Sequence, residues 1–333
     1  MTSRTLTQMF LSLAALVVLA MSAFAGDPGA VGPARVNDQA AGPILIYNAY
    51  SSSSTNPAAE NTRIAITNKN DQYSQLVHLF FVDGATCSVA DNFVCLTKSQ
   101  TMTLLASDVD PDVRGYIVAI QVNDKGEPVL TNRNLIGDAY IKLATGHSAN
   151  LGAEAIISAT ATAPDANMTA RVTIAVPRVV AADNIPSAKD GNDTLLILNR
   201  LYQNNLLTGG FDASNNGGGI FGLLFDELEN SYSYTINFNC QIRQTLSDSF
   251  PRTTPRFTSV VPAGTSGWTK MWSTGSTVGL LGATINKNTT MSATSFSGGH
   301  NLHKLTYTST YLLIPVFPAM GCGTQAPELV DSF

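Results

Sequence analysis

The chain has 333 residues and a formal net charge of −5, and 13% of its residues are Asp, Glu, Lys or Arg, against about 25% in an average protein. Binding to nucleic acid draws on clustered Lys and Arg, so this composition argues against a phosphate-backbone partner. The length is ample for one large or two medium domains with a proper core.

The first 25 residues have the order of a secretory signal peptide. Arg4 supplies a positive charge, an apolar stretch runs from Met9 to Met21, and Ala23-Phe24-Ala25 forms a small-x-small cleavage site. The apolar stretch is shorter than the roughly 20 residues of a membrane-spanning helix, although an uncleaved anchor is the alternative. We therefore predict a signal peptide over 1–25, export to the periplasm, cell surface or medium, and no transmembrane anchor in the mature chain.

Four cysteines remain after the predicted cleavage: Cys87, Cys95, Cys240 and Cys322. An even number in an oxidising compartment predicts two disulfides. Cys87 and Cys95 are close enough in sequence to close a local loop, and Cys240 with Cys322 would then join the C-terminal tail to a central strand. The sequence leaves this pairing open. A zinc site is the alternative, but the C-x2-C spacing that such sites favour is missing.

Short runs of β-strand character follow one another along the chain, separated by turn clusters. We predict strands at 44–47, 63–67, 76–82, 101–105, 116–122, 135–143 and 171–176, and then at 195–198, 220–225, 231–238, 278–285 and 305–313. In the run 231–238 the residues Tyr232, Tyr234 and Ile236 alternate with small polar residues, which indicates one buried face. The nearly continuous apolar run 76–82 indicates a central strand.

Strands of this length and spacing are typical of β-sandwiches rather than of βαβ units. We predict an all-β fold with two Ig-like or jelly-roll-like sandwich units, over 43–180 and 194–320. A flexible linker at 26–42, a second linker at 181–193 and a C-terminal tail at 321–333 complete the predicted organisation. The order of strands is similar in both halves, which leaves a distant internal duplication open.

Several groups of polar residues are candidate sites. Asp108, Asp110 and Asp112 stand at every second position, as in the opening of a calcium-binding EF-hand loop. Because the glycine and the closing glutamate of that loop are missing, a solvated turn is the alternative. His300 and His303 would share one face of a helix but diverge on a strand, which argues against a metal site there.

Other catalytic signatures are weak or missing. His147 and Glu154 are close in sequence, but a surface loop explains them better, because acid–base catalysis needs a geometry that this spacing does not show. The sequence contains neither a Gly-x-Ser-x-Gly elbow nor a phosphate-binding glycine loop followed by Lys-Ser or Lys-Thr. We therefore predict that the chain is not an enzyme and that it needs no cofactor, except for calcium at the three aspartates.

Trp268 and Trp272, with Tyr232 and Tyr234, are candidates for an aromatic platform that contacts a sugar or a protein. Glycine neighbours place the two tryptophans in a predicted loop, where binding residues often lie. Packing in the core is the alternative.

The first half of the chain also resembles a known set of proteins. The pattern consists of Val-His-Leu-Phe-Phe-Val-Asp-Gly at 77–84, Cys-Leu-Thr at 95–97 and Leu-Ala-Ser-Asp-Val-Asp-Pro at 105–111. It is similar to uncharacterised secreted β-rich proteins of Gram-negative bacteria. The resemblance covers residues 43–157. It implies export and β-architecture, and it brings no functional residues.

These observations predict an exported, non-catalytic structural, adhesive or self-assembling protein of a surface or matrix. Its partners would be protein surfaces, including further copies that pair through strand edges. A carbohydrate-binding module that uses Trp268 and Trp272 is the first alternative. An extracytoplasmic hydrolase is the second, because a carboxylate pair for such chemistry would meet only in the fold.

Overall fold

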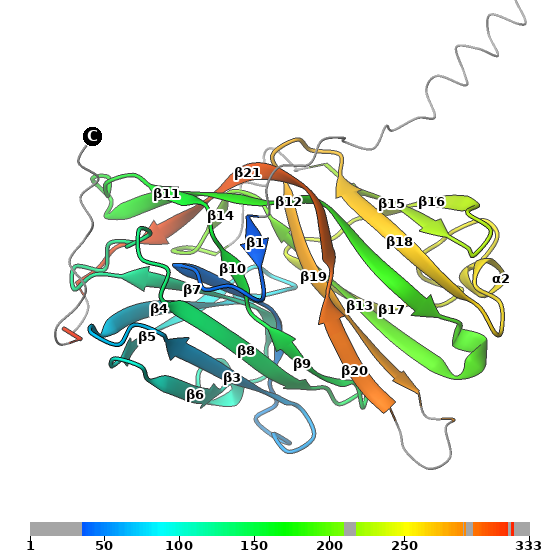
Figure 1. Cartoon of the computed structure of the whole chain (residues 1–333), viewed down its shortest axis with the longest axis horizontal. Helices are drawn as coiled ribbons and strands as arrows, with labels where there is room; N and C mark the ends of the chain where they lie inside the picture. The colour runs from blue at the N-terminus through cyan, green and yellow to red at the C-terminus, as the bar shows by residue number, and fades with distance from the viewer. Residues whose placement is uncertain (1–34, 210–217, 289, 291–295, 319–320, 323–333) are drawn as a thin grey trace, which may run out of the picture. The chain divides into compact units, whose positions relative to one another are not determined.

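The computed structural model describes residues 35–209, 218–288, 290, 296–318 and 321–322, and these residues form an almost entirely β structure (Figure 1). The predicted fold class is confirmed: antiparallel sheets pack as sandwiches. The predicted signal peptide and residues 323–333 of the predicted tail lie outside the described residues. Within the part of the chain that is described, no helix has the length and hydropathy that crossing a bilayer requires.

The first sandwich consists of two sheets, here called sheets I and II. Sheet I has the order β1 (Val36–Asn37), β10 (Glu154–Ile156), β2 (Ile44–Ser51), β7 (Arg114–Val122), β4 (Gln75–Asp83) and β5 (Val89–Leu96). Sheet II has the order β6 (Thr101–Leu105), β3 (Asn61–Asn68), β8 (Leu135–Lys142) and β9 (Ser148–Gly152). Alternate residues of each sheet, such as Tyr47, Phe81 and Ile64, meet in the core between them.

The second sandwich consists of sheets III and IV. Sheet III has the order β14 (Asn204–Asn205), β21 (His303–Pro315), β12 (Thr169–Pro186), β18 (Ser266–Ser273), β15 (Ile220–Phe225) and β16 (Ser231–Ile236), and β11 (Ala159–Ala161) also pairs with β12. Sheet IV has the order β17 (Gln241–Thr245), β13 (Asn192–Leu201), β19 (Gly279–Asn288) and β20 (Phe296–Asn301). The core between them contains Leu196, Leu280 and Met271, together with Tyr234 and Ile236 on the predicted buried face of β16.

Sheet I is buried on both faces, because the long strands β12 and β21 of sheet III extend over it. Val172 and Ile174 in the first half of β12 pack on sheet I, whereas Val180 in the second half packs on sheet IV. Figure 1 shows β12 and β21 side by side along this path. This double burial explains why β4 is apolar along nearly its whole length, as expected of a central strand.

The predicted domain boundaries need two corrections. The expected linker at 181–193 is the end of β12, a single turn of 3-10 helix (η2, Ala188–Asp190) and the start of β13. Asp183 and Asn184 read as turn residues, but they are exposed in a bulge where the register with β18 shifts and where Asn184 has a φ of 43°. The expected linker at 26–42 contains β1, which pairs with β10. The internal duplication is not confirmed and stays a prediction.

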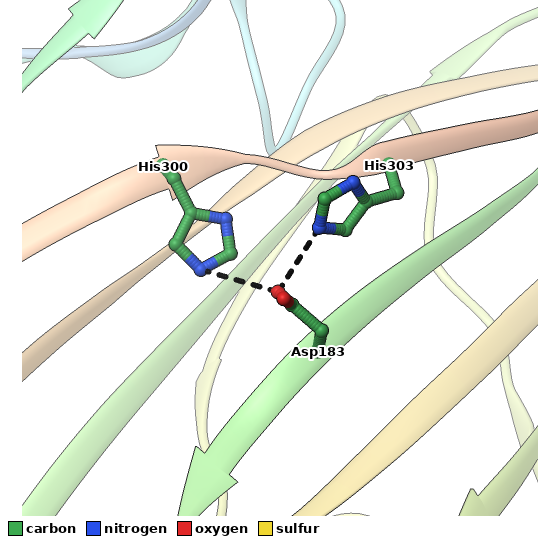
Figure 2. A group of neighbouring side chains, drawn as sticks. All are labelled: Asp183, His300 and His303. Carbon is green, nitrogen blue, oxygen red and sulfur yellow. Dashed lines mark ion pairs between the residues drawn. The ribbon is translucent and has the colours of Figure 1, made fainter.

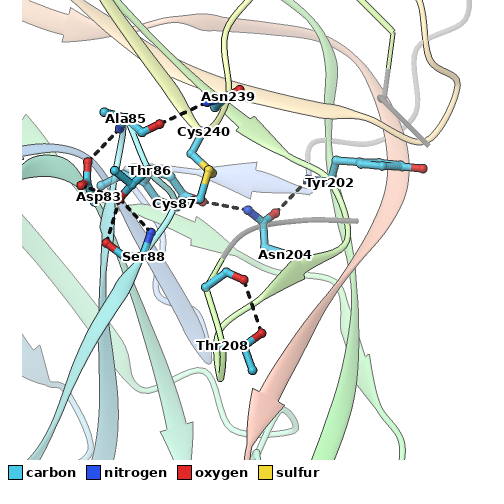
Figure 3. The surroundings of a disulfide bond; sticks show 12 residues. Asp83, Ala85, Thr86, Cys87, Ser88, Tyr202, Asn204, Thr208, Asn239 and Cys240 are labelled. Atoms are coloured by element: carbon cyan, nitrogen blue, oxygen red, sulfur yellow. Dashed lines mark hydrogen bonds between the residues drawn. A yellow bond between two sulfur atoms is a disulfide. The ribbon is translucent and has the colours of Figure 1, made fainter. Parts of the chain in front are cut away.

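Both disulfides connect segments far apart in the sequence, so the expected local pairing is wrong. Cys87, in the loop between β4 and β5, is bonded to Cys240, and Cys95 of β5 is bonded to Cys322. The first bond joins the two sandwiches, and Asn239 next to it donates a hydrogen bond to the carbonyl of Ala85 (Figure 3). Cys87 lies in the turn at 83–88 that precedes β5, whereas Cys95 pairs with Leu76 near the other end of that strand, so the extended strand keeps the two cysteines apart.

Candidate functional site

Two histidines and one aspartate meet on the surface where β20 and β21 adjoin β12. The Nε2 atoms of His300 and His303 lie 3.6 and 3.1 Å from the same oxygen of Asp183, Oδ1 (Figure 2). One ligand atom from each residue lies within 4.8 Å of the others. Among the described residues this is the one group of three His, Cys, Asp or Glu side chains close enough to hold a metal ion.

The backbone explains how two residues of a β-segment come to point the same way. His300 belongs to β20 and pairs with Thr284 of sheet IV, whereas His303 begins β21 and pairs with Ala181 of sheet III. Leu302 separates the two strands, is 2% exposed and donates its N–H to the carbonyl of Gly282. The chain therefore changes sheets at Leu302, and the alternation that would separate the two imidazoles is interrupted.

The predicted calcium ligands are not brought together as a site. The carboxylate of Asp110 accepts a hydrogen bond of 2.5 Å from the hydroxyl of Tyr50, and that of Asp112 accepts one of 2.8 Å from the backbone of Ser54. Asp108 ends a single turn of 3-10 helix, η1 (Ala106–Asp108). The carboxylates of Asp110 and Asp112 therefore bind the segment before β7 to Tyr50 and Ser54, as in the alternative of a turn held by Asp side chains.

The predicted aromatic platform is reduced to one exposed ring. Trp268 is 37% exposed and stacks on Phe225, with ring centroids 4.2 Å apart and planes 5° apart. Trp272 is 3% exposed and Tyr234 is 5% exposed, so neither presents an open ring face. The two tryptophans lie on β18, and not in the loop that the glycines suggested.

His147 and Glu154 have separate roles in a buried polar region. The ring of His147 contacts the carbonyl of Asp193 at 2.8 Å, and burial lowers its pKa. Glu154 is fully buried and lies 2.7 Å from the ammonium group of Lys304. Burial raises the pKa of Glu154 to about 7, although Lys304 opposes the rise. Asn48 contacts Glu154 and also donates to the carbonyl of Gly282, linking sheets I and IV.

A carboxylate pair suited to glycoside hydrolysis is not formed in the two hollows that contain arginine. A hollow of about 660 Å³ is lined by Arg35, Arg133 and uncharged residues. Another of about 310 Å³ contains Glu60, whose carboxylate is bound by Arg114 at 2.7 Å, and Arg243. Neither hollow places two described carboxylates face to face.

The edge strands β6, which pairs only with β3, and β16, which pairs only with β15, carry no charged residue and no proline. The strands β9 and β20 and the short strands β1, β11 and β14 also lack Asp, Glu, Lys, Arg and Pro, but β9 and β20 lie beside each other, where Ser148 and Ser297 are hydrogen-bonded. Beyond the pairings with β3 and β15, no backbone hydrogen bond between described residues involves 101–105 or 231–236. Side chains on β6 and β16 alternate between an exposed and a less exposed face, with Thr103 and Ser233 among the exposed ones.

Sequence reasoning missed Asp183, because it lies far from the histidines in the chain and inside a predicted linker. The spacing of residues along the chain does not indicate that Asp183 lies beside His300 and His303. The sequence matches none of the protein-family models and has no significant match among curated proteins.

Proposed function

We propose that this chain is an exported, non-catalytic structural protein that associates with further copies of itself through the strand edges β6 and β16. The observation that carries the proposal is the character of these two edges. Each ends a sheet, each lacks charge and proline, and neither edge is covered by another described segment through backbone hydrogen bonds.

Free edges of this kind favour pairing because their outward N–H and C=O groups match those of any other strand. Natural proteins usually protect edges with lysine, proline or bulges. The sequences Thr-Met-Thr-Leu-Leu in β6 and Ser-Tyr-Ser-Tyr-Thr-Ile in β16 instead combine β-branched, aromatic and aliphatic residues that suit a strand. Such edges present unpaired N–H and C=O groups to which a further strand can bond.

The occupant is a second copy, because one chain carries two compatible edges in different sandwiches. Pairing of β6 in one copy with β16 in the next is head-to-tail and continues into a filament unless the rotation closes a ring. The two disulfides support such a use, since one joins the sandwiches and the other holds the C-terminal segment on β5. The low charge of the chain supports it as well, because repulsion between copies is weak.

The test is light scattering coupled to size exclusion, with negative-stain microscopy, on the mature chain across a range of concentrations. The variants are Thr103→Lys and Ser233→Lys, which place a charge beside each edge. The matched control is Ala65→Lys on β3, directly opposite Thr103 but with β6 on one side and β8 on the other. Asp138 of β8 faces Ala65 and gives the new lysine a partner.

We expect the parent and the control to associate as concentration rises, and either edge variant to remain monomeric, because each head-to-tail contact needs one edge of each kind. If Ser233→Lys prevents association but Thr103→Lys does not, the contact is a pairing between the β16 strands of two copies. A parent chain that remains monomeric at every concentration, or edge variants that associate as the parent does, would overturn the proposal.

Glycan binding at Trp268 is a second candidate, favoured by the exposure of this ring beside Phe225. Aromatic rings present an apolar surface that packs on sugar faces. A glycan array that compares the parent with Trp268→Ala tests it, and the candidate fails if the array is blank or if the variant binds equally.

A further inference from the structure

We infer that Asp183, His300 and His303 form a zinc-binding site with an open fourth position. The inference is independent of edge pairing, because none of the three residues lies on β6 or β16. It starts from the two Nε2 atoms that converge on one carboxylate oxygen, as Figure 2 shows.

The separations of the ligand atoms fit a tetrahedral ion. Zinc binds imidazole nitrogen and carboxylate oxygen at about 2.0–2.1 Å, so two ligands of one tetrahedron lie roughly 3.3 Å apart. The distances from Asp183 Oδ1 to the two Nε2 atoms are 3.1 and 3.6 Å, on either side of that value. The ligand atoms of the two histidines lie within 4.8 Å of each other, so binding of an ion requires an imidazole to rotate toward it.

The chemistry of the ligand set also suits zinc. Two neutral imidazoles and one carboxylate are a combination that zinc accepts in sites with three protein ligands. The carboxylate also offsets part of the charge of the ion. Lys304 follows His303 directly, but its ammonium group is directed to Glu154 and so does not compete for Asp183.

One histidine is held in the orientation that binding needs. Nδ1 of His300 lies 3.2 Å from the carbonyl oxygen of Asn301, which favours a proton on Nδ1 and leaves the Nε2 lone pair for a metal. Nε2 of His300 also lies 3.3 Å from the hydroxyl of Thr284, which can donate to that lone pair until an ion takes its place.

The exposure of the group determines what kind of site it is. The three side chains are between 51% and 57% exposed, so the side of the ion away from the protein faces solvent. A structural zinc site is closed by four protein ligands, whereas three ligands leave a position for water or for a donor atom from another molecule. The bound zinc ion would therefore keep a solvent molecule as its fourth ligand. It would also connect β12 to the junction of β20 and β21.

The test is isothermal titration of tag-free mature protein with zinc chloride, followed by the visible spectrum of the cobalt(II) form. The variants are His300→Ala, His303→Ala and Asp183→Asn, all at exposed positions where folding is insensitive to the change. Asp112→Asn is the matched control, because it removes an exposed carboxylate from the predicted calcium turn. The parent used in this titration and all variants carry Thr103→Lys and Ser233→Lys, so that self-association does not affect the stoichiometry.

We expect one zinc per chain, cobalt absorption of tetrahedral intensity, and at least a tenfold loss of affinity in each of the three ligand variants but not in the control. No measurable binding by the parent would overturn the inference. So would binding that the three variants leave unchanged, because the ion would then lie elsewhere.

Discussion

Glu154 gives the most quantitative prediction, through the substitution Glu154→Gln. The side chain is fully buried, and its pKa of about 7 stands above the ordinary value of 4.5. Between these two pH values the folded chain keeps a proton that the unfolded chain has released, so the free energy of unfolding falls as pH rises. At about 1.36 kcal/mol for each pH unit, the whole effect is about 3 kcal/mol.

The assay is denaturant unfolding of the parent and of Glu154→Gln at intervals from pH 4 to pH 8. The free energy of unfolding of the parent, relative to that of the variant, should decrease by about 3 kcal/mol between pH 4.5 and pH 7 and stay level outside this window. Taking the difference removes the contributions of His78 and His147, whose pKa values burial lowers and whose effect on stability has the opposite sign.

Glu60 provides a control of opposite sign. Burial raises its pKa, but hydrogen bonds from Arg114 and Ser51 outweigh burial and bring the pKa below the ordinary value. The parent should therefore lose stability relative to Glu60→Gln as the pH falls into the acid range. A difference between the parent and Glu154→Gln that is constant from pH 4.5 to pH 7 would refute the reasoning about Glu154.

Three further predictions concern stability. Replacing Cys87 and Cys240 by serine removes a disulfide that spans 153 residues. On the loop-entropy relation it should lower the free energy of unfolding by about 5 kcal/mol, measured from the denaturant midpoint. Peptide mapping of the parent chain without reduction should recover these two cysteines in one bonded pair. Trp272→Ala should cost about 3–5 kcal/mol because it empties a buried position, whereas Trp268→Ala should cost clearly less in the same assay. Gly115→Ala places a Cβ 1.7 Å from a backbone oxygen of β4 and should lower the thermal midpoint by forcing β4 and β7 apart, an effect absent if that pairing is wrong.

The strands that could be predicted are those whose side chains alternate or are continuously apolar. The bounds of β6 and β15 match the predicted runs. In both, polar or turn residues flank a short run of strand-forming residues. β18 was missed because Gly267 and Lys270 interrupt its apolar pattern, although Lys270 lies on the outer face where charge is tolerated. β12 was cut short at residue 176 because Pro177 follows, where the register with β21 shifts, and the exposed bulge at Asp183 and Asn184 has the composition of a turn.

The candidate site was predictable only in part, for a related reason. His300 and His303 were visible as a pair, and the rule that strand neighbours diverge is correct for a continuous strand. The break at Leu302 depends on the chain passing from sheet IV to sheet III, which no local pattern encodes. The expected local disulfide failed because residues 89–96 form the extended strand β5, which was not predicted and which separates Cys87 from Cys95.

Self-association through β6 and β16 is tested most directly by hydrogen–deuterium exchange of the mature chain, in dilute solution and at a concentration where it assembles. The proposal predicts that the amides of residues 101–105 and 231–236 that are not bonded to β3 or β15 exchange quickly when dilute and are protected on assembly. The amides of the exposed residues Asp124 and Lys125 should exchange equally in both. Assembly that leaves both edges unprotected, with protection appearing elsewhere, would contradict it.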